Sequence, residues 1–216
     1  MSKLLLHACC GVCALEPVRL LKEENRDFSV AYINSNIHPQ DEYEMRLDAL
    51  KDYVCEPNEL DLFVGKYDTD EWNKRVAIHG QNKRERCRAC YRMRFEELAQ
   101  TAAEKGFDSI STTLTISPYQ YKDIIFEELD KAAKPYNLQV EKVDYSEHYW
   151  DAQNISRQNG MYRQKYCGCS ISIAEAEQTR KEIKERRKRE KAEKRAARER
   201  EEARIREAKR NGTYHR

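Results

Sequence analysis

The chain has 216 residues and carries 40 Lys and Arg against 38 Asp and Glu, a formal net charge of +2 at pH 7. This length favours one folded domain with an appendage over two full domains. No apolar run approaches the roughly 18 residues that a membrane span needs, and the first residues lack the basic and apolar pattern of a secretory signal. We therefore expect a cytoplasmic protein that does not enter a membrane.

The charge is unevenly distributed along the chain. Residues 1–174 carry 23 Lys and Arg against 28 Asp and Glu, whereas residues 175–216 carry 17 against 10. We expect residues 1–174 to form the folded domain and residues 175–216 to form a charged helical or disordered extension. Such a charge run is typical of a solvated helix, and the alternative is an arm that follows an RNA backbone.

The pattern of apolar residues predicts alternating strands and helices up to residue 143. Strands are expected at 3–7, 28–34, 61–64, 109–114 and 138–143, and helices at 12–24, 40–54, 90–105 and 120–134. This order favours an α/β fold with an open parallel sheet and right-handed crossovers. Residues 69–77 read as a polar segment, and the aromatic and polar stretch 145–166 reads as a loop or short-helix lid.

Seven of the eight cysteines fall in three short groups that lie far apart in the sequence. The groups are Cys9-Cys10-Gly11-Val12-Cys13, Cys87-Arg88-Ala89-Cys90 and Cys167-Gly168-Cys169. In a reducing compartment, clustered thiols are more often metal ligands or redox groups than structural disulfides. The first group and the segment Thr112–Pro118 follow expected strands, and ligands of open parallel sheets collect at the carboxyl ends of the strands.

Four thiolates at one point would make a metal site, and Cys9, Cys10, Cys87 and Cys90 are the candidates. Adjacent cysteines fit a structural zinc poorly, because neighbouring side chains on an extended segment point apart. A 4Fe-4S cluster tolerates divergent ligands, because its irons occupy separate corners of a cube. The residues therefore favour iron–sulfur over zinc and leave both open.

The remaining cysteines differ in kind. A disulfide between Cys167 and Cys169 would be strained, and strained exposed disulfides tend to be labile and oxidising, so this pair suits a redox-active dithiol or a metal chelate. Cys13 is a further candidate ligand, because one helical turn separates it from Cys9. Cys55 stands alone and is expected to be a small buried hydrophobe.

Basic residues crowd the CxxC pair between residues 83 and 94, where Glu85 is the only acid. Positive charge at this place would favour thiolates and stabilise an anionic cluster. The same residues would suit RNA phosphates, and the plainest alternative is a solvated helix face.

Four motifs occur in a fixed order along the chain. They are His7-Ala8-Cys9-Cys10-Gly11-Val12-Cys13, the Cys87–Arg94 box, Thr112 with Leu114 and Ser117-Pro118-Tyr119, and Tyr162–Cys169. The set resembles that of the QueH-type epoxyqueuosine reductases over roughly residues 3–175. The resemblance implies a nucleotide-hydrolase-like fold related to the PP-loop group, and reduction of epoxyqueuosine to queuosine at the wobble position of tRNA.

The resemblance also implies roles for the cysteines. Cys9, Cys10, Cys87 and Cys90 would hold a 4Fe-4S cluster, Cys167 and Cys169 would be the redox-active pair, and a second metal ion, iron or zinc, would lie near the cluster. The implied partners are a tRNA anticodon stem-loop and an unidentified electron donor. Candidate proton donors are His7, Tyr119, Tyr166 and His148, and Tyr149 or Trp150 are available to stack on unpaired bases.

Two other functions remain open. A PP-loop-like tRNA sulfur-transfer enzyme would carry persulfide sulfur on Cys167 or Cys169, but no Gly-rich phosphate loop follows the first expected strand. A zinc-stabilised RNA-binding module would use the thiols only to hold its fold.

Overall fold

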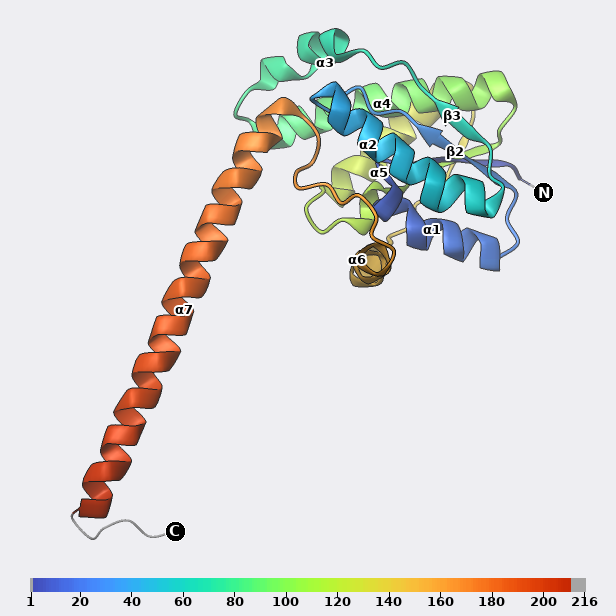
Figure 1. The fold of residues 1–216 in the computed structure, drawn as a ribbon. Helices are drawn as coiled ribbons and strands as arrows, with labels where there is room; N and C mark the ends of the chain where they lie inside the picture. Colours follow the sequence, from blue (N-terminus) through green and yellow to red (C-terminus); the bar gives the residue numbers. More distant parts are fainter. Residues whose placement is uncertain (1, 211–216) are drawn as a thin grey trace. The chain divides into compact units, whose positions relative to one another are not determined.

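Five parallel strands form the sheet at the centre of the fold (Figure 1). A computed structural model describes the backbone of residues 2–210 and the side chains of residues 2–200 and 204–206. The strands are β1 (Leu4–His7), β2 (Phe28–Tyr32), β3 (Leu62–Val64), β4 (Ser109–Thr112) and β5 (Gln139–Val140). Their order is β3-β2-β1-β4-β5, and each neighbouring pair is parallel. The predicted open parallel α/β sheet is confirmed.

Helices α1 to α5 lie in the connections between the strands, and α6 and α7 follow β5. The bounds of the helices are α1 (Gly11–Glu23), α2 (Gln40–Leu50), α3 (Thr69–Arg75), α4 (Lys83–Lys105), α5 (Lys122–Ala133), α6 (Tyr149–Gln158) and α7 (Ser170–Arg210). α4 begins earlier than predicted, because the Asn82 side chain accepts a hydrogen bond from the backbone N–H of Glu85 and caps the helix. The helix ends at Gly106, whose φ of 73° suits glycine. The early start places the whole CxxC motif on a helix.

Alternating side chains along β1 divide the core into two layers. Leu5 packs on the face covered by α4 and α5, whereas Leu4 and Leu6 pack on the face covered by α1 and α2. All three leucines are fully buried. Each contributes about 2 kcal/mol through its removal from water. Because both faces are covered, β1 is apolar along its length instead of alternating with polar residues.

Three local predictions differ from the structure. The strand expected to continue to residue 114 stops at Thr112, whose Oγ1 accepts a hydrogen bond of 3.2 Å from the N–H of Leu114 and starts a short helical turn. The last strand covers only Gln139–Val140. The polar segment after β3 contains α3, which Asp68 caps by accepting from the N–H of Glu71 at 2.9 Å. The stretch 145–166, expected to be a loop or short-helix lid, contains the short helix α6 and so agrees with the prediction.

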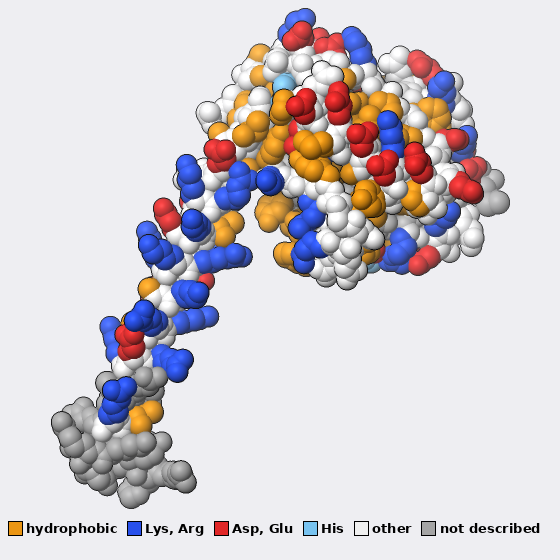
Figure 2. All heavy atoms as spheres, viewed as in Figure 1, with side chains coloured by type: hydrophobic (Ala, Val, Ile, Leu, Met, Phe, Trp, Pro, Cys, Tyr) orange, Lys and Arg blue, Asp and Glu red, His pale blue; other side chains and the backbone are white. Residues whose placement is uncertain are grey.

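The structure divides into two compact units, Met1–Ile171 and Ser172–Arg216. The described residues of the second unit belong to α7, which begins at Ser170. This helix is long and rich in charged residues, so the predicted charged C-terminal helix is confirmed. Figure 2 shows Lys and Arg side chains along this helix. Among the described residues, no helix is long and apolar enough to cross a membrane.

Candidate metal centre

Three cysteine sulfurs meet where β1 gives way to α1. The Sγ atoms of Cys9, Cys10 and Cys13 all lie within 4.8 Å of one another, and those of Cys9 and Cys10 are 3.9 Å apart. Cys10 caps α1, since its sulfur accepts a hydrogen bond of 3.4 Å from the N–H of Cys13. The close start of α1 beside α2 depends on Gly11, because an added Cβ would lie 2.6 Å from the carbonyl oxygen of Ala49. The sulfur trio could hold a metal ion.

Hydrogen bonds among these thiols make Cys10 the most acidic of the three. Cys13 and Cys9 donate to its sulfur and hold the pKa of Cys10 well below its ordinary value. The same sharing raises the pKa of Cys13 well above its ordinary value and that of Cys9 to about 11. The first thiolate therefore forms at Cys10, and a bound cation would be needed to ionise the other two.

The CxxC and CxC motifs form a second thiol group. Cys169 packs with Cys90 in a buried cluster, whereas Cys167 is exposed. Burial raises the pKa of Cys87 to about 12 and that of Cys90 to about 11, and the neighbouring thiols of Cys167 and Cys169 add to both increases. Cys167 and Cys169 therefore lie close enough to the CxxC pair to act on the pKa of Cys87 and of Cys90. Cys87 and Cys90 lie outside the 4.8 Å grouping of the first trio.

Two buried arginines interact electrostatically with cysteines of both thiol groups. The positive charge of Arg94 favours the thiolates of Cys9 and Cys90. Burial alone would lower the pKa of Arg46, but Cys10 and Cys167 help to raise it. Arg94 and Arg46 are 3% and 2% exposed. The two groups therefore lie around fixed positive charges, which suits a centre built from several thiolates.

Four side chains donate hydrogen bonds to five of the sulfurs, because Gln164 Nε2 also donates to Cys13 at 3.8 Å. The donors are Thr113 Oγ1 to Cys9 (3.7 Å), Gln164 Nε2 to Cys10 (3.0 Å), Trp72 Nε1 to Cys90 (3.5 Å) and Gln120 Nε2 to Cys167 (3.6 Å). Hydrogen bonds to sulfur tune the electronics of thiolate-bound metals. None of these roles was predicted from the sequence. Gln164 lies inside the last sequence motif, and Gln120 directly follows the third. This closeness to the motifs is the one sequence signal that could have indicated the two glutamines.

The candidate proton donors differ in their surroundings. Burial, with the charge of Arg94, lowers the pKa of His7 to about 3, so its imidazole is neutral near pH 7 and is a poor acid. Tyr166 donates its hydroxyl to the carbonyl oxygen of His38. Tyr119 is 72% exposed. Of these three, Tyr119 has the most accessible side chain.

The arginines between residues 83 and 94 either pair with acidic residues of α5 or are buried. Arg88 Nη1 and Arg92 Nε contact the buried Glu128 carboxylate of α5 at 2.8 and 2.7 Å. Burial alone would raise the pKa of Glu128, but hydrogen bonds from these arginines and from Lys131 lower it to about 2. Arg86 is 2% exposed. The structure therefore gives Arg88 and Arg92 a shared partner within the protein, and the binding of RNA phosphates by this segment stays a prediction.

Cys55 is 3% exposed and packs in the core, as predicted.

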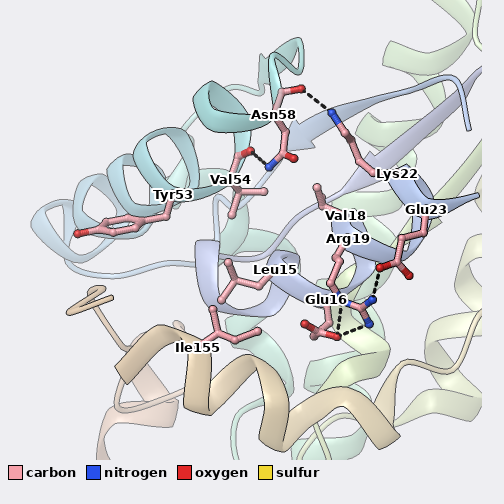
Figure 3. A pocket seen from close by; sticks show the side chains of 10 residues that line it. All are labelled: Leu15, Glu16, Val18, Arg19, Lys22, Glu23, Tyr53, Val54, Asn58 and Ile155. Atoms are coloured by element: carbon pink, nitrogen blue, oxygen red, sulfur yellow. Dashed lines mark hydrogen bonds and ion pairs between the residues drawn. The ribbon is translucent and has the colours of Figure 1, made fainter. Parts of the chain in front are cut away.

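A pocket of about 440 Å³ lies between α1, residues 53–58 and α6 (Figure 3). Arg19 at its edge is paired with Glu16 at 2.8 Å and with Glu23 at 2.6 Å. None of the described residues that line it is a cysteine, so the pocket is separate from the thiol groups.

Known proteins resemble this chain over most of its length. Among solved structures, a predicted subunit of a tRNA methyltransferase from Methanocaldococcus jannaschii has a TM-score of 0.49 at 12% identity, covering 72% of this chain and 76% of that one. Proteins named epoxyqueuosine reductase QueH are similar in sequence. The one from Dehalococcoides mccartyi is 33% identical over 79% of this chain and 92% of its own. The one from Thermotoga maritima is 31% identical over 87% and 98%.

The family model described as "Epoxyqueuosine reductase QueH" matches residues 4–175. This segment includes both thiol groups and the four side chains that donate to their sulfurs. Members of the family are named as reductases, which are oxidoreductases. The chain therefore belongs to the epoxyqueuosine reductase QueH family.

Proposed function

We propose that this protein reduces epoxyqueuosine to queuosine at the wobble position of tRNA, with electrons from a donor still to be identified. The observation that carries the proposal is the gathering of seven thiols in two neighbouring groups, around Arg46 and Arg94, within the segment matched to the family. Residues 1–174 would be the catalytic domain and residues 175–216 an extension.

The thiols present fit a 4Fe-4S cluster held by Cys9, Cys10, Cys87 and Cys90. Each thiol group would supply two ligands, and polar donors reach three of these four sulfurs. Cys13, left over in the first group, would be a ligand for a second metal ion, iron or zinc. When bound, such a cluster supplies electrons one at a time.

We assign Cys167 and Cys169 to a redox-active dithiol. Oxidation of two thiols to a disulfide releases two electrons and two protons, and removal of one epoxide oxygen as water consumes the same number of each. Cys169 is held in a buried cluster with Cys90, whereas Cys167 is exposed and accessible to an external reductant. This arrangement supports the assignment, because one thiol of the pair is buried near Cys90 and the other is open to solvent.

The direct test is nucleoside analysis of epoxyqueuosine-containing tRNA after anaerobic incubation with the reduced protein. Conversion to queuosine is expected, and none under strong reductant would contradict the proposal. Cys167→Ser and Cys169→Ser should each abolish turnover and leave the metal content unchanged. Cys55→Ala, a change at a buried cysteine of the core, should retain both. Full turnover in either serine variant would remove the dithiol from the mechanism.

The two other functions have distinct readouts. A colourless protein loaded with zinc after anaerobic purification would favour the RNA-binding module. ATP-dependent incorporation of sulfur into tRNA would favour the sulfur-transfer enzyme.

A further inference from the structure

Three aromatic rings lie side by side next to the first thiol group. The ring centroids of Tyr119 and Tyr149 are 6.4 Å apart, and those of Tyr149 and Trp150 are 5.1 Å apart, both in edge-to-face geometry. Tyr149 packs against the buried cluster that contains Cys10 and Cys13. The rings come from two separate segments, the loop after β4 and the start of α6. The fold therefore assembles an aromatic surface beside the thiols.

The two outer rings of this surface are open to solvent. Tyr119 is 72% exposed and Trp150 is 67% exposed. Exposed large aromatic side chains that contact one another mark a binding surface more often than a packing role. Tyr149 joins them to the buried cluster, so a ligand on the outer rings would lie close to Cys10 and Cys13.

Unpaired RNA bases match this surface in chemistry. In an anticodon loop the wobble nucleotide has unpaired neighbours, and bases without a partner stack on aromatic side chains. The charge of Arg163 also acts on Tyr149, and a cation near the rings would favour the adjoining phosphates. Arg88 and Arg92 of α4 are paired with Glu128, whereas the rings offer RNA an exposed surface that adjoins the cluster of Cys10 and Cys13.

We propose that Tyr119, Tyr149 and Trp150 form a stacking platform for unpaired anticodon bases that flank the wobble nucleotide. The proposal rests on the proposed function, because it takes tRNA as the substrate. The platform would hold the loop while the modified base reaches the thiols.

The two tryptophans of the chain allow a specific test, because Trp72 is fully buried and Trp150 is exposed. An unmodified anticodon stem-loop RNA added to the metal-loaded protein should quench the fluorescence of Trp150, whereas a fully paired duplex should not. Trp150→Phe should lose the quenching and keep its affinity. Trp150→Ala should weaken binding roughly tenfold and raise the KM for tRNA more than it lowers kcat.

Tyr136→Ala is the matched control, since Tyr136 is also exposed but lies in the turn between α5 and β5. It should leave RNA affinity unchanged. Unchanged affinity in both Trp150→Ala and Tyr119→Ala would overturn the platform. The probe carries no epoxyqueuosine, so this result is separate from the reductase assay: an active enzyme with unchanged binding would contradict the platform alone.

A second inference concerns the charges of α7. Basic residues recur every three or four positions between residues 180 and 198, and at 100° per residue they fall within an arc of about 120°. They are Arg180, Lys184, Arg187, Lys188, Lys191, Lys194, Arg195 and Arg198. The remaining face carries acids such as Glu182, Glu190 and Glu193 between other charged and small residues. One face of this stretch is therefore uniformly basic.

A polyanion is the partner that this face fits. A membrane surface or a coiled-coil partner would need an apolar face, and the side of the described helix opposite the basic face is largely charged. The basic face extends over about 27 Å, long enough to contact several successive phosphates. We propose that it binds the phosphate backbone of tRNA, an inference that also rests on the proposed function. The family match ends at residue 175, so this contact would be added to the family's own segment.

Two triple variants of the full chain test the face against net charge. Lys184→Gln with Arg187→Gln and Lys191→Gln removes three charges from the basic face. Arg186→Gln with Arg189→Gln and Arg200→Gln removes three from the opposite side. The first set should weaken binding of an unmodified tRNA transcript about tenfold and lower the salt slope by about three. The second set should change binding less than twofold.

Equal weakening by both sets would overturn the assignment to a face, and no effect of the first set would overturn RNA binding by α7. Binding of the full chain to anionic lipid vesicles that the first set abolishes, with tRNA binding intact, would identify a membrane surface instead. Circular dichroism of both sets should show the same helix content as the parent chain.

Discussion

Cys90→Ala is expected to yield a protein that lacks its metal centre and does not reduce epoxyqueuosine. Cys90 shares a buried cluster with Cys169, so it links the two motifs of the second thiol group. Trp72 Nε1 donates to its sulfur at 3.5 Å, so the site is built to hold negative charge there. Iron and sulfide content per chain, the visible spectrum after anaerobic purification and nucleoside analysis of treated tRNA measure the loss.

A milder variant distinguishes metal binding by Cys90 from the adjustment of the reduction potential by its hydrogen bond. Trp72→Phe keeps the thiol and removes the N–H donor, so the protein should bind metal and show a lower reduction potential. Cys55→Ala should retain metal, spectrum and activity. A Cys90→Ala protein with full iron content would show that Cys90 is not a ligand.

The sheet could be predicted because each strand carries its own signal. The run Leu4–Leu6 is apolar throughout, as expected of a strand covered on both faces, and the helices that cover it show their own apolar spacing. The clustering of cysteines was equally visible. These features depend on residues close together in the sequence.

The partners of the thiols depend on distant contacts and could not be predicted in the same way. The structure brings Cys13 close to Cys9 and Cys10, and it gathers Cys169 and Cys90 in one buried cluster. The expected ligand set of Cys9, Cys10, Cys87 and Cys90 stays a prediction. The pairing of Cys169 with Cys90 exists because the segment after α6 is anchored on α2, a contact across about 120 residues. No local pattern encodes such a contact.

The partners of the basic residues between positions 83 and 94 could not be predicted from the sequence either. Arg88 and Arg92 look available for phosphates in the sequence, because their partner Glu128 lies on the next helix. Once α4 packs on α5, a buried carboxylate left without these arginines would be costly, so the charges pair inside the protein. A charge run can therefore be assigned to an external partner only after its internal partners are known.

Gly168→Ala is expected to displace the CxC motif and lower turnover at least tenfold, with the metal retained. The φ of Gly168 is 140°, and an added Cβ would lie 2.8 Å from Asn36 Nδ2 and 3.3 Å from Arg46 Nη1. Backbone strain of this kind costs about 1–3 kcal/mol, so the segment should move to relieve it. Gly160→Ala is the matched control, because φ there is also positive, at 63°, but no atom lies within 4 Å of the added Cβ.

Arg46→Lys tests the position of the CxC motif through the residue that holds its backbone. Arg46 donates to the carbonyl oxygens of Cys167 and Tyr166 at 2.8 and 3.1 Å, and its Nε donates to Glu42 at 2.8 Å. A lysine keeps the charge beside the buried Glu42 but cannot reproduce this planar set of donors. The variant should therefore fold, bind metal and lose turnover as Gly168→Ala does.

In both variants the rate of Cys167 alkylation should change while the iron content does not. Gly168→Ala adds a methyl group to the CxC segment, whereas Arg46→Lys weakens the hydrogen bonds that anchor this segment. If both variants lose turnover, the common cause is the displaced dithiol. Full turnover with an altered alkylation rate would mean that the dithiol need not be held in this position for the reaction.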